Sequence, residues 1–253
     1  MRNSVHILSV ITLLTCSWRY AFALIDGLYP GSGIEQIQLL YSDADIIVLN
    51  KPPNMNTAPG VVETTSLAGF VADMYSIPRV DRMIVHRLDY ATSGVVVLAR
   101  NLDALTALHR QFRIKQQVFK AYTAVVHGHP LSSEGEVDLP IGRDSLRGSP
   151  FQCVSPEEGK ASLTHWTLLR VTGHRSLLLL RPITGRTHQL RVHLASIGLP
   201  IVGDKFYCSD KTRCGDETKG IQRLFLHAEM LGIVHPRTNV PLRFTARRPF
   251  EFY

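Results

Sequence analysis

The most informative part of the sequence is the stretch VHRLDYATSGVVVLA at residues 85–99. Its last five residues, 95–99, form an unbroken apolar run rich in valine, which predicts a central strand of a sheet. Its first part holds His86, Arg87 and Asp89 between this run and an apolar pair that precedes it. A polar group between two apolar segments is partly buried, and a buried carboxylate needs a cationic or hydrogen-bonding partner. The stretch therefore predicts a strand preceded by a charged loop, which is either a salt-bridged turn or part of a functional site.

Apolar patterns on both sides of this stretch predict a mixture of strands and helices. Thr65 or Ser66 is expected to cap one helix and Asn101 a second, because such side chains accept hydrogen bonds from the first backbone N–H groups. Polar stretches rich in Gly, Ser and Pro predict loops at residues 143–160 and 207–222. The irregular order of elements favours an α+β fold, with a mixed, largely antiparallel central sheet flanked by helices. The other predicted strands are residues 45–50, 118–127, 162–171, 176–181 and 224–234.

A second polar stretch, PITGRTHQLRVHLASIGLPIVGDKFY at residues 182–207, predicts a short helix. Thr184 or Thr187 is expected to cap this helix, and Gly198 is expected to end it. Side chains rich in hydrogen-bond donors suit a phosphate, a base edge or a carboxylate as the group that is bound. The donors are Arg186, His188, Gln189, Arg191 and His193.

The composition is that of an ordinary globular protein. The chain has 253 residues, of which 45% are hydrophobic, so it can bury a sizeable core without disulfides or a structural metal. Its four cysteines contain no CxxC pair and are expected to be isolated reduced thiols. The net charge is +7, and all of the excess lies in residues 171–253, which hold 13 basic and six acidic residues. A basic surface attracts polyanions such as RNA.

Several common site motifs are absent from the sequence. There is no glycine-rich phosphate loop, no GxSxG elbow and no HExxH pair, and His188 and His193 are spaced so that they lie off a common helix face. The spacing of these histidines argues against a metal site, and the sequence shows no motif of a nucleotide site or a serine hydrolase.

The first 23 residues differ from the rest of the chain. Arg2 precedes an apolar run at residues 5–16, and a small-x-small motif follows at residues 21–23. This layout predicts a secretory-type or targeting leader, although a start codon placed too early or a buried N-terminal helix would give the same pattern. With a genuine leader the protein is expected in an organelle, a plastid or mitochondrion, and otherwise in the cytoplasm.

Long motifs in the chain resemble those of the RluA-type pseudouridine synthases, in register over about residues 37–248. The resemblance implies the pseudouridine synthase fold, as a single catalytic domain over residues 35–253 without the S4 RNA-binding domain that several members carry. One departure is Asn54, where the family usually has glycine, and asparagine tolerates the same left-handed turn. The motifs are LYSDADIIVLNKPPNM (40–55), VHRLDYATSG (85–94), KAYTAVVHG (120–128), TGRTHQLRVHLASIGLPIVGD (184–204) and RLFLHAEMLGIVHP (223–236).

The resemblance also implies roles for individual residues. Asp89 matches the catalytic aspartate, Tyr122 the tyrosine that stacks on the target base, and Arg191 the arginine paired with the catalytic carboxylate. Arg87 matches the arginine that fills the gap left by the flipped nucleotide. Four further donors of the two polar stretches, His86, Arg186, His188 and Gln189, are expected to bind the RNA.

The expected activity is isomerisation of specific uridines in structured RNA, a tRNA anticodon stem-loop or an rRNA hairpin, without a cofactor, a metal ion or an obligate protein partner, by a monomer. Asp89 is expected to act as a nucleophile at C1′ or as a base at the 2′ position, as an ionised carboxylate acts beside the anomeric carbon in glycosidases. Two alternatives stay open. One is a catalytically silent RNA-binding protein on the same fold, and the other is a nucleoside glycosidase that uses Asp81 as a second acid.

Overall fold

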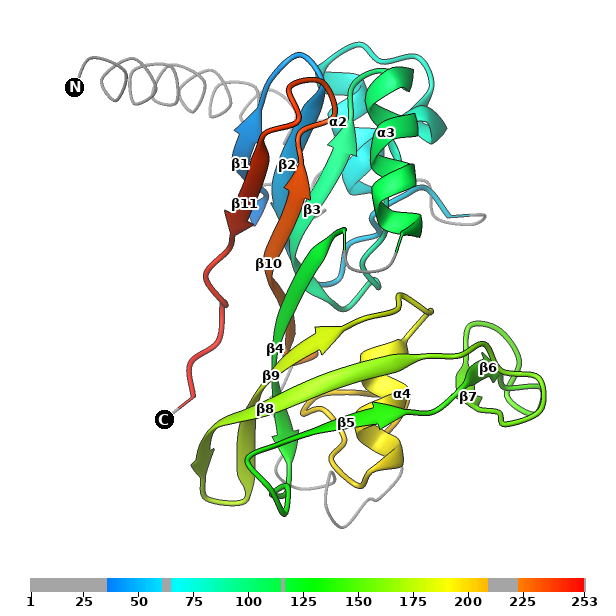
Figure 1. The fold of residues 1–253 in the computed structure, drawn as a ribbon, viewed down its shortest axis with the longest axis vertical. Helices are drawn as coiled ribbons and strands as arrows, with labels where there is room; N and C mark the ends of the chain where they lie inside the picture. The colour runs from blue at the N-terminus through cyan, green and yellow to red at the C-terminus, as the bar shows by residue number, and fades with distance from the viewer. Residues whose placement is uncertain (1–35, 61–64, 115–116, 209–222, 253) are drawn as a thin grey trace.

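A computed structural model describes residues 36–60, 65–114, 117–208 and 223–252 of the chain (Figure 1). The predicted leader and most of the predicted loop at 207–222 lie outside the described residues. None of the helices in the described part is both long and apolar enough to span a lipid bilayer.

One curved sheet of nine strands organises the molecule (Figure 1). The strand order is β1-β2-β3-β10-β4-β9-β8-β5, and β11 pairs with the free part of β10. All neighbours are antiparallel except β3 and β10, so the α+β class with a mixed, largely antiparallel sheet is confirmed. The strands are β1 (Gln38–Ser42), β2 (Ile46–Lys51), β3 (Ser93–Ala99), β4 (Phe119–His127), β5 (Glu134–Asp138), β8 (Leu163–Thr172), β9 (Arg175–Pro182), β10 (Leu226–Val234) and β11 (Pro241–Thr245).

Two helices cover the first half of the sheet, formed by β1, β2 and β3, and both begin where the sequence predicts. Helix α2 (Leu67–Met74) is capped by Ser66, whose hydroxyl accepts from the N–H of Gly69. Helix α3 (Leu102–Arg113) is capped by Asn101. A short 3-10 helix, Val80–Met83, follows α2 and leads to the loop before β3.

The alternation of side chains along β2 explains why the two helices lie on opposite faces of the sheet. Ile47 and Leu49 pack in the cluster that contains the buried face of α2, while Ile46 and Val48 pack with the buried side chains of α3. Successive strand residues point to opposite faces, so a strand covered on both sides is apolar at every position. The predicted strand at residues 95–99, which is part of β3, is an unbroken apolar run for the same reason.

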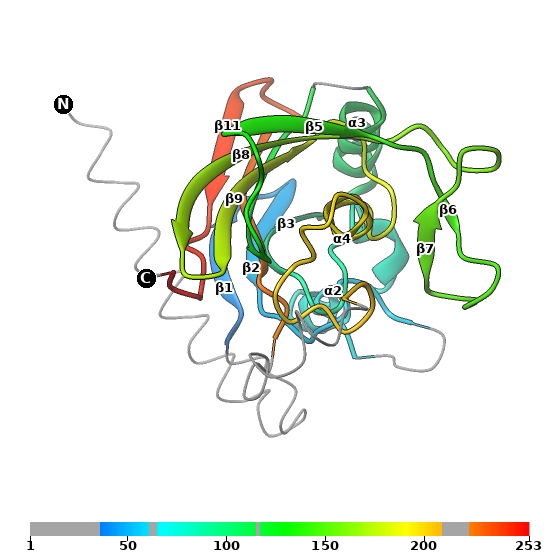
Figure 2. The ribbon, with the colours of Figure 1, turned by 90° about the horizontal axis from the view of Figure 1, so that it is seen from below.

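The second half of the sheet, β4, β9, β8 and β5, curves around the third helix, α4 (Gln189–Ser196) (Figure 2). The i, i+4, i+7 spacing of Leu190, Leu194 and Ile197 predicts a buried stripe on this helix, and Leu190 and Leu194 pack with Leu178 and Leu180 of β9. Ile197, which follows the last turn, is exposed, so the prediction is wrong for this residue. Thus α4 is attached to this half by the same apolar contacts that form its core.

The expected cap of α4 by Thr184 or Thr187 is wrong. The residue before the helix is His188, which adopts the left-handed conformation with φ 55° and makes no capping hydrogen bond. The Thr184 hydroxyl donates instead to the side chain of Gln189. Gly198, with φ 76°, follows the last turn as predicted.

The two halves meet at β10, which runs parallel to β3 on one side and antiparallel to β4 on the other. Ser93 pairs with His227 and Gly94 with Ala228. Gly94 has a φ of 121°, and a Cβ atom there would lie 2.3 Å from the carbonyl oxygen of Ala228, so no other residue fits without moving the backbone. This close crossing fixes the start of β3, and therefore the charged loop before it, at the junction of the halves.

Three further local predictions have different outcomes in the structure. The predicted loop at 143–160 is partly wrong, because it contains most of a small hairpin made of β6 (Ile141–Arg143) and β7 (Gln152–Val154). Asn54 has a φ of 57°, which confirms the left-handed turn. Cys208 is disulfide-bonded, contrary to the expectation of reduced thiols, whereas Cys153 is free.

Candidate active site

A cavity of about 740 Å³ opens at the junction of the two halves. This volume lies in the range of pockets that hold small ligands or one extruded base. The first half supplies the loops around residues 56–60 and 86–92 and the end of α3. The second half supplies the start of β4 and residues 182–191, which lead into α4.

The loop that carries Asp89 is anchored on both sides of this residue. The hydroxyl of Thr57 donates to the carbonyl of Leu88 and accepts from its N–H, at 2.9 and 3.1 Å. The carbonyl of Tyr90 accepts from the N–H of Met55 and from Lys51 Nζ, at 3.2 and 3.3 Å. The Asp89 backbone is thus held by two neighbours bonded to the same segment, residues 51–57.

Lys51 is the central support of that segment. Its side chain is fully buried, and Nζ also donates to the carbonyls of Pro52 and Met55, each at 2.8 Å. Burial lowers the pKa of Lys51 to about 7. Sequence reasoning placed Lys51 only at a strand end, because nothing in the pattern says which carbonyls a lysine will meet.

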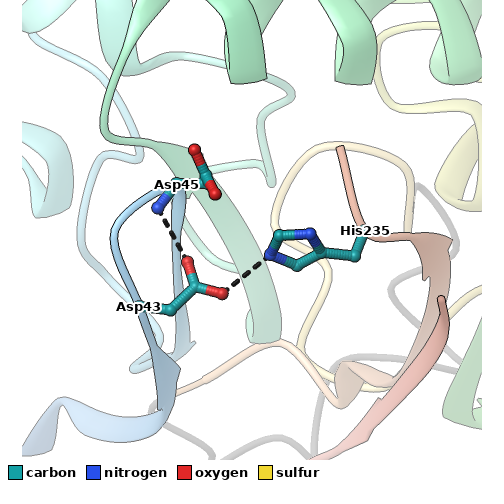
Figure 3. A group of neighbouring side chains, drawn as sticks. All are labelled: Asp43, Asp45 and His235. Atoms are coloured by element: carbon teal, nitrogen blue, oxygen red, sulfur yellow. Dashed lines mark hydrogen bonds and ion pairs between the residues drawn. The ribbon is translucent and has the colours of Figure 1, made fainter. Parts of the chain in front are cut away.

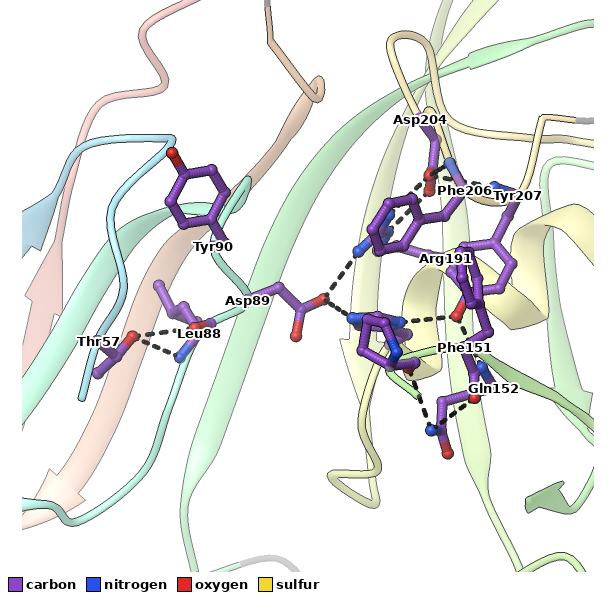
Figure 4. A network of polar contacts seen from close by, with 12 residues as sticks. Thr57, Leu88, Asp89, Tyr90, Phe151, Gln152, Arg191, Asp204, Phe206 and Tyr207 are labelled. Carbon is purple, nitrogen blue, oxygen red and sulfur yellow. Dashed lines mark hydrogen bonds and ion pairs between the residues drawn. The ribbon is translucent and has the colours of Figure 1, made fainter. Parts of the chain in front are cut away.

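Asp89 points across the cavity from the first half towards α4 (Figure 4). Its Oδ2 atom lies 3.6 Å from Arg191 Nη1 and 3.9 Å from His188 Nε2. Oδ1 makes no hydrogen bond or ion pair with the described residues, and the side chain is 26% exposed. Oδ2 of Asp89 therefore faces Arg191 on α4 and His188 just before it, while Oδ1 is free for a substrate.

Arg191 has a closer partner that sequence reasoning missed. Its Nε and Nη2 atoms donate to the two carboxylate oxygens of Asp204 at 2.8 and 2.7 Å, and both side chains are buried. Burial alone would lower the pKa of Arg191, but Asp204 and Asp89 raise it above its ordinary value. The expected ion pair of Arg191 with Asp89 is present, but at 3.6 Å it is longer than the 2.7 Å contact of Arg191 with Asp204. Asp204 orients the guanidinium, so that Nη1 faces Asp89.

His188 completes this side of the cavity. Its Nδ1 atom lies 2.7 Å from the hydroxyl of Tyr207, and its ring is packed against Phe206 and Tyr207. Burial lowers the pKa of His188 more than the neighbouring charge of Asp89 raises it. The imidazole is therefore neutral at pH 7.

Tyr122 enters the cavity from β4, beside Asp89. Burial, together with the charge of Asp89, raises the pKa of Tyr122 well above its ordinary value. The phenol is protonated at all physiological pH values, and its ring is a flat apolar surface on the wall of the cavity.

His86 and Arg87, which are neighbours in the sequence, differ in the structure. His86 Nε2 accepts a hydrogen bond from the N–H of Val97 on β3 at 3.1 Å, and its ring stacks on Phe112. Burial lowers the pKa of His86 to about 3. His86 Nε2 is therefore bonded within the fold and is not available for the expected role in substrate binding. Arg87 is exposed on the cavity wall without a hydrogen bond to the described residues.

Gln189 is also engaged within the protein. Its amide oxygen accepts from Thr184 and from the N–H of Arg186, and its amide nitrogen donates to Leu163 and Thr164. These four bonds use its full hydrogen-bonding capacity. The expectation that Gln189 binds substrate is therefore wrong for the side chain, which instead fixes the turn before α4.

The cations around the cavity come from distant parts of the chain. Arg186 is exposed and donates to the carbonyl of Ala161, while the half-buried Lys120 donates to the carbonyl of Thr184. Arg87 and Arg113 complete the set that lines the opening. The positive charge at the site therefore does not come from the C-terminal third alone, as the charge count suggested.

Asp89 is the only carboxylate among the described residues that line the cavity. Asp81, considered above as a second acid, is exposed, and both of its oxygens accept from Arg79. Among the described residues, therefore, this cavity offers no second acid for a mechanism that needs two carboxylates.

A group of acidic and histidine side chains lies away from the cavity, at the ends of β1 and β10 (Figure 3). Asp43 accepts from His235 Nε2 and from Tyr41, each at 2.7 Å, while Asp45 accepts from Arg237. His235 Nδ1 accepts two backbone N–H groups. The ligand atoms are already occupied by hydrogen bonds, so this group joins two turns of the sheet.

Comparison with known proteins gives consistent results. Residues 45–196 match the family model of RNA pseudouridylate synthases. The chain is 40% identical over 213 residues to the dual-specificity RNA pseudouridine synthase RluA of Escherichia coli, covering 84% of this chain and 93% of that protein. An RNA pseudouridine synthase of Zymomonas mobilis is 41% identical over 197 residues, 78% of this chain and 87% of that one.

Solved structures agree with the sequence matches. Human RNA pseudouridylate synthase domain containing 1 has a TM-score of 0.71 at 32% identity, covering 88% of this chain and 87% of that chain. Human RNA pseudouridylate synthase domain containing 4 has a TM-score of 0.68 at 25% identity, with coverages of 92% and 94%.

Proposed function

Since this chain belongs to the family of RNA pseudouridylate synthases, we propose that it converts uridine to pseudouridine at specific positions of structured RNA, with Asp89 as the catalytic carboxylate. We further propose that the RNA is a tRNA anticodon stem-loop, a hairpin of large-subunit rRNA, or both. The E. coli relative is named as dual-specific.

The observation that carries the catalytic assignment is the position of Asp89. It is the single carboxylate in the described lining of the cavity, its Oδ2 faces Arg191 and His188, and its Oδ1 is free. In the reaction the bond between N1 and C1′ breaks, the base turns, C5 joins C1′, and the proton of C5 is replaced by one gained at N1. A carboxylate beside C1′ supports this chemistry either as a nucleophile or as a base at the 2′ position.

The other residues of the cavity act on the extruded nucleotide. The ring of Tyr122 offers a stacking surface for the uracil, and such stacking contributes about 1–3 kcal/mol per base. Arg87, an exposed cation on the wall, fills the space that the nucleotide leaves in the RNA. Arg186 and Lys120 bind the backbone near the target. Each of these roles rests on the location of the residue in the cavity and on the family resemblance.

The substitution Asp89→Asn tests the proposal, because it keeps the size of the side chain and removes its charge. We expect pseudouridine formation on unmodified tRNA and large-subunit rRNA transcripts to fall by at least about 10³-fold, as it does when a central catalytic group is lost. Binding of the same transcripts is expected to persist. Mass spectrometry of the digested RNA measures the product.

The matched control is Asp81→Asn, which removes the same charge at an exposed site and is expected to leave activity unchanged. Loss of activity in this variant, with release of free uracil by the wild type, would support a glycosidase. RNA binding by wild-type protein that forms no pseudouridine would instead indicate a silent RNA-binding protein. Near-normal activity of the Asp89 variant would contradict the catalytic assignment.

A further inference from the structure

A chain of polar contacts leads from the β6–β7 hairpin to the Asp89 carboxylate (Figure 4). The backbone N–H of Gln152, on β7, lies 3.0 Å from the Tyr207 hydroxyl oxygen. This hydroxyl lies 2.7 Å from Nδ1 of His188, whose Nε2 lies 3.9 Å from Oδ2 of Asp89. The imidazole is therefore placed between a phenol and a carboxylate.

The direction of these hydrogen bonds follows from the groups themselves. A backbone N–H can only donate, so Gln152 occupies a lone pair of the Tyr207 oxygen. Burial raises the pKa of Tyr207, so the phenol keeps its proton at neutral pH. At 2.7 Å, Nδ1 of His188 is the acceptor within reach of that proton. His188 Nδ1 is then unprotonated, and the single proton of the neutral ring is on Nε2.

The opposite end of the ring selects the same form. An ionised carboxylate can only accept hydrogen bonds. An Nε2 lone pair facing Asp89 Oδ2 would be repelled, whereas an Nε2–H is attracted. The phenol on one side and the carboxylate on the other thus favour the same tautomer of His188, and the phenol, at 2.7 Å against 3.9 Å, is the closer of the two groups.

We propose that His188 and Tyr207 are positioning residues for the catalytic carboxylate, the Tyr207 hydroxyl fixing the tautomer in which His188 directs an N–H at Asp89 Oδ2. This inference rests on the proposed function, and it assigns His188 a role towards the enzyme's own carboxylate rather than towards the RNA. Two donors, Arg191 and His188, hold the same oxygen and leave Oδ1 for the nucleotide.

The surroundings of Tyr207 fit this role. Its backbone N–H donates to Asp204 Oδ1 at 3.2 Å, and the guanidinium of Arg191 lies 5.1 Å from the centre of its ring. Asp204 thus orients both arms that reach Asp89, directly through Arg191 and indirectly through Tyr207. The 3.9 Å contact of His188 is longer than a hydrogen bond, as catalytic contacts often are in a free enzyme before they tighten in the complex with substrate.

The tautomer can be read directly in the free protein. Long-range ¹H–¹⁵N NMR distinguishes protonated from unprotonated ring nitrogens. For wild-type His188 we expect a protonated Nε2 and an unprotonated Nδ1 at pH 7.5, and for Tyr207→Phe we expect a mixture of the two tautomers. A protonated Nδ1 in the wild type would overturn the inference, whatever the activity.

The kinetic test uses Tyr207→Phe, His188→Asn and the double variant. Asparagine tolerates the left-handed backbone of residue 188 and keeps an acceptor for Tyr207, but it has no atom where Nε2 lies. We expect each single variant to lower the single-turnover rate by about 3–10-fold, the usual contribution of one hydrogen bond, with RNA affinity unchanged. Because both act through one contact, the double variant is expected to be no slower than His188→Asn.

Tyr41→Phe serves as the matched control, since it removes one 2.7 Å hydroxyl hydrogen bond far from the cavity, to Asp43. It is expected to leave the rate unchanged. Additive losses in the double variant, or losses that appear only in RNA affinity, would overturn the inference. Wild-type protein that is silent on both RNA transcripts would refute the proposed function instead, and the NMR experiment separates that outcome from failure of the tautomer.

Discussion

At the level of single residues, the direction in which Arg191 faces Asp89 depends on a second ion pair, which Arg191 makes with Asp204. Arg191 gives two of its donors to Asp204 and turns the third towards Asp89. A planar guanidinium fixed by a bidentate carboxylate cannot rotate freely, which is the advantage of arginine over lysine here. Asp204 is therefore as important for the direction of the positive charge as Arg191 is for its presence.

Substitution Asp204→Asn is expected to affect both stability and catalysis. It leaves the buried Arg191 without its closest charge, and breaking a buried pair in this way costs about 3–5 kcal/mol. Arg191 is also freed to turn away from Asp89 Oδ2, so the rate of pseudouridine formation should fall in the remaining folded protein. Urea unfolding measures the first effect and single-turnover assays the second.

Asp81→Asn provides the comparison, because Asp81 also accepts two hydrogen bonds from one arginine, Arg79, but at an exposed site. Exposed pairs contribute about 0–1 kcal/mol. Equal destabilisation by the two substitutions would refute the special role of the buried pair.

At the scale of elements, apolar patterns predicted the central strands and the first two helices but not the edges. β5 has the sequence EGEVD, with one buried residue, so it shows no pattern to detect. The hairpin of β6 and β7 has three residues per strand and is formed by pairing rather than by hydrophobicity. The start of α4 was misjudged because Thr184 bonds to the Gln189 side chain, a contact that the order of residues does not reveal.

The residues of the candidate active site likewise divide into those that the sequence predicts and those that it does not. The sequence resemblance indicated Asp89, Tyr122 and Arg191, and the fold brings them to one cavity. Lys51 and Asp204 were missed, because their partners are set by how the loops close and not by spacing along the chain.

His86 closes an edge of β3 and makes the fold sensitive to acid. Its Nε2 accepts from the N–H of Val97, and burial lowers its pKa to about 3, against 6.5 in the unfolded chain. Below pH 6.5 the unfolded state binds a proton that the folded state excludes. The contribution of His86 to the free energy of unfolding is therefore complete above pH 6.5. It falls by about 1.4 kcal/mol per pH unit as the pH drops towards 3.

The substitution His86→Gln tests this expectation, since the amide oxygen can accept from Val97 without titrating. Between pH 6 and 4 the free energy of unfolding should fall less steeply in the variant than in the wild type, by about 1.4 kcal/mol per pH unit. Urea unfolding at several pH values gives the two slopes. Parallel slopes would mean that His86 is protonated in the folded protein.

At the level of the complete fold, cationic residues that are far apart in the sequence come together around one cavity. The crossing of β3 and β10 joins two halves, and the cavity forms where they meet. Cations reach this opening from residues 87, 113, 120 and 186, which belong to different elements. RNA would therefore contact both halves at once, and its phosphates would displace counterions from a site assembled only in the folded chain.

Arg186 is the member of this group best suited to a test of that contact, because it is exposed and, among the described residues, its side chain bonds only to the Ala161 carbonyl. Arg186→Gln should weaken RNA binding and reduce the slope of log affinity against log salt by about 0.7–0.9, the value for one lost phosphate contact. The rate at saturating RNA should stay close to that of the wild type, since Arg186 does not contact Asp89. The exposed Arg82, which does not line the cavity, supplies the control Arg82→Gln, expected to leave the salt slope unchanged. Equal slopes for Arg186→Gln and wild-type protein would place the RNA backbone elsewhere on the surface.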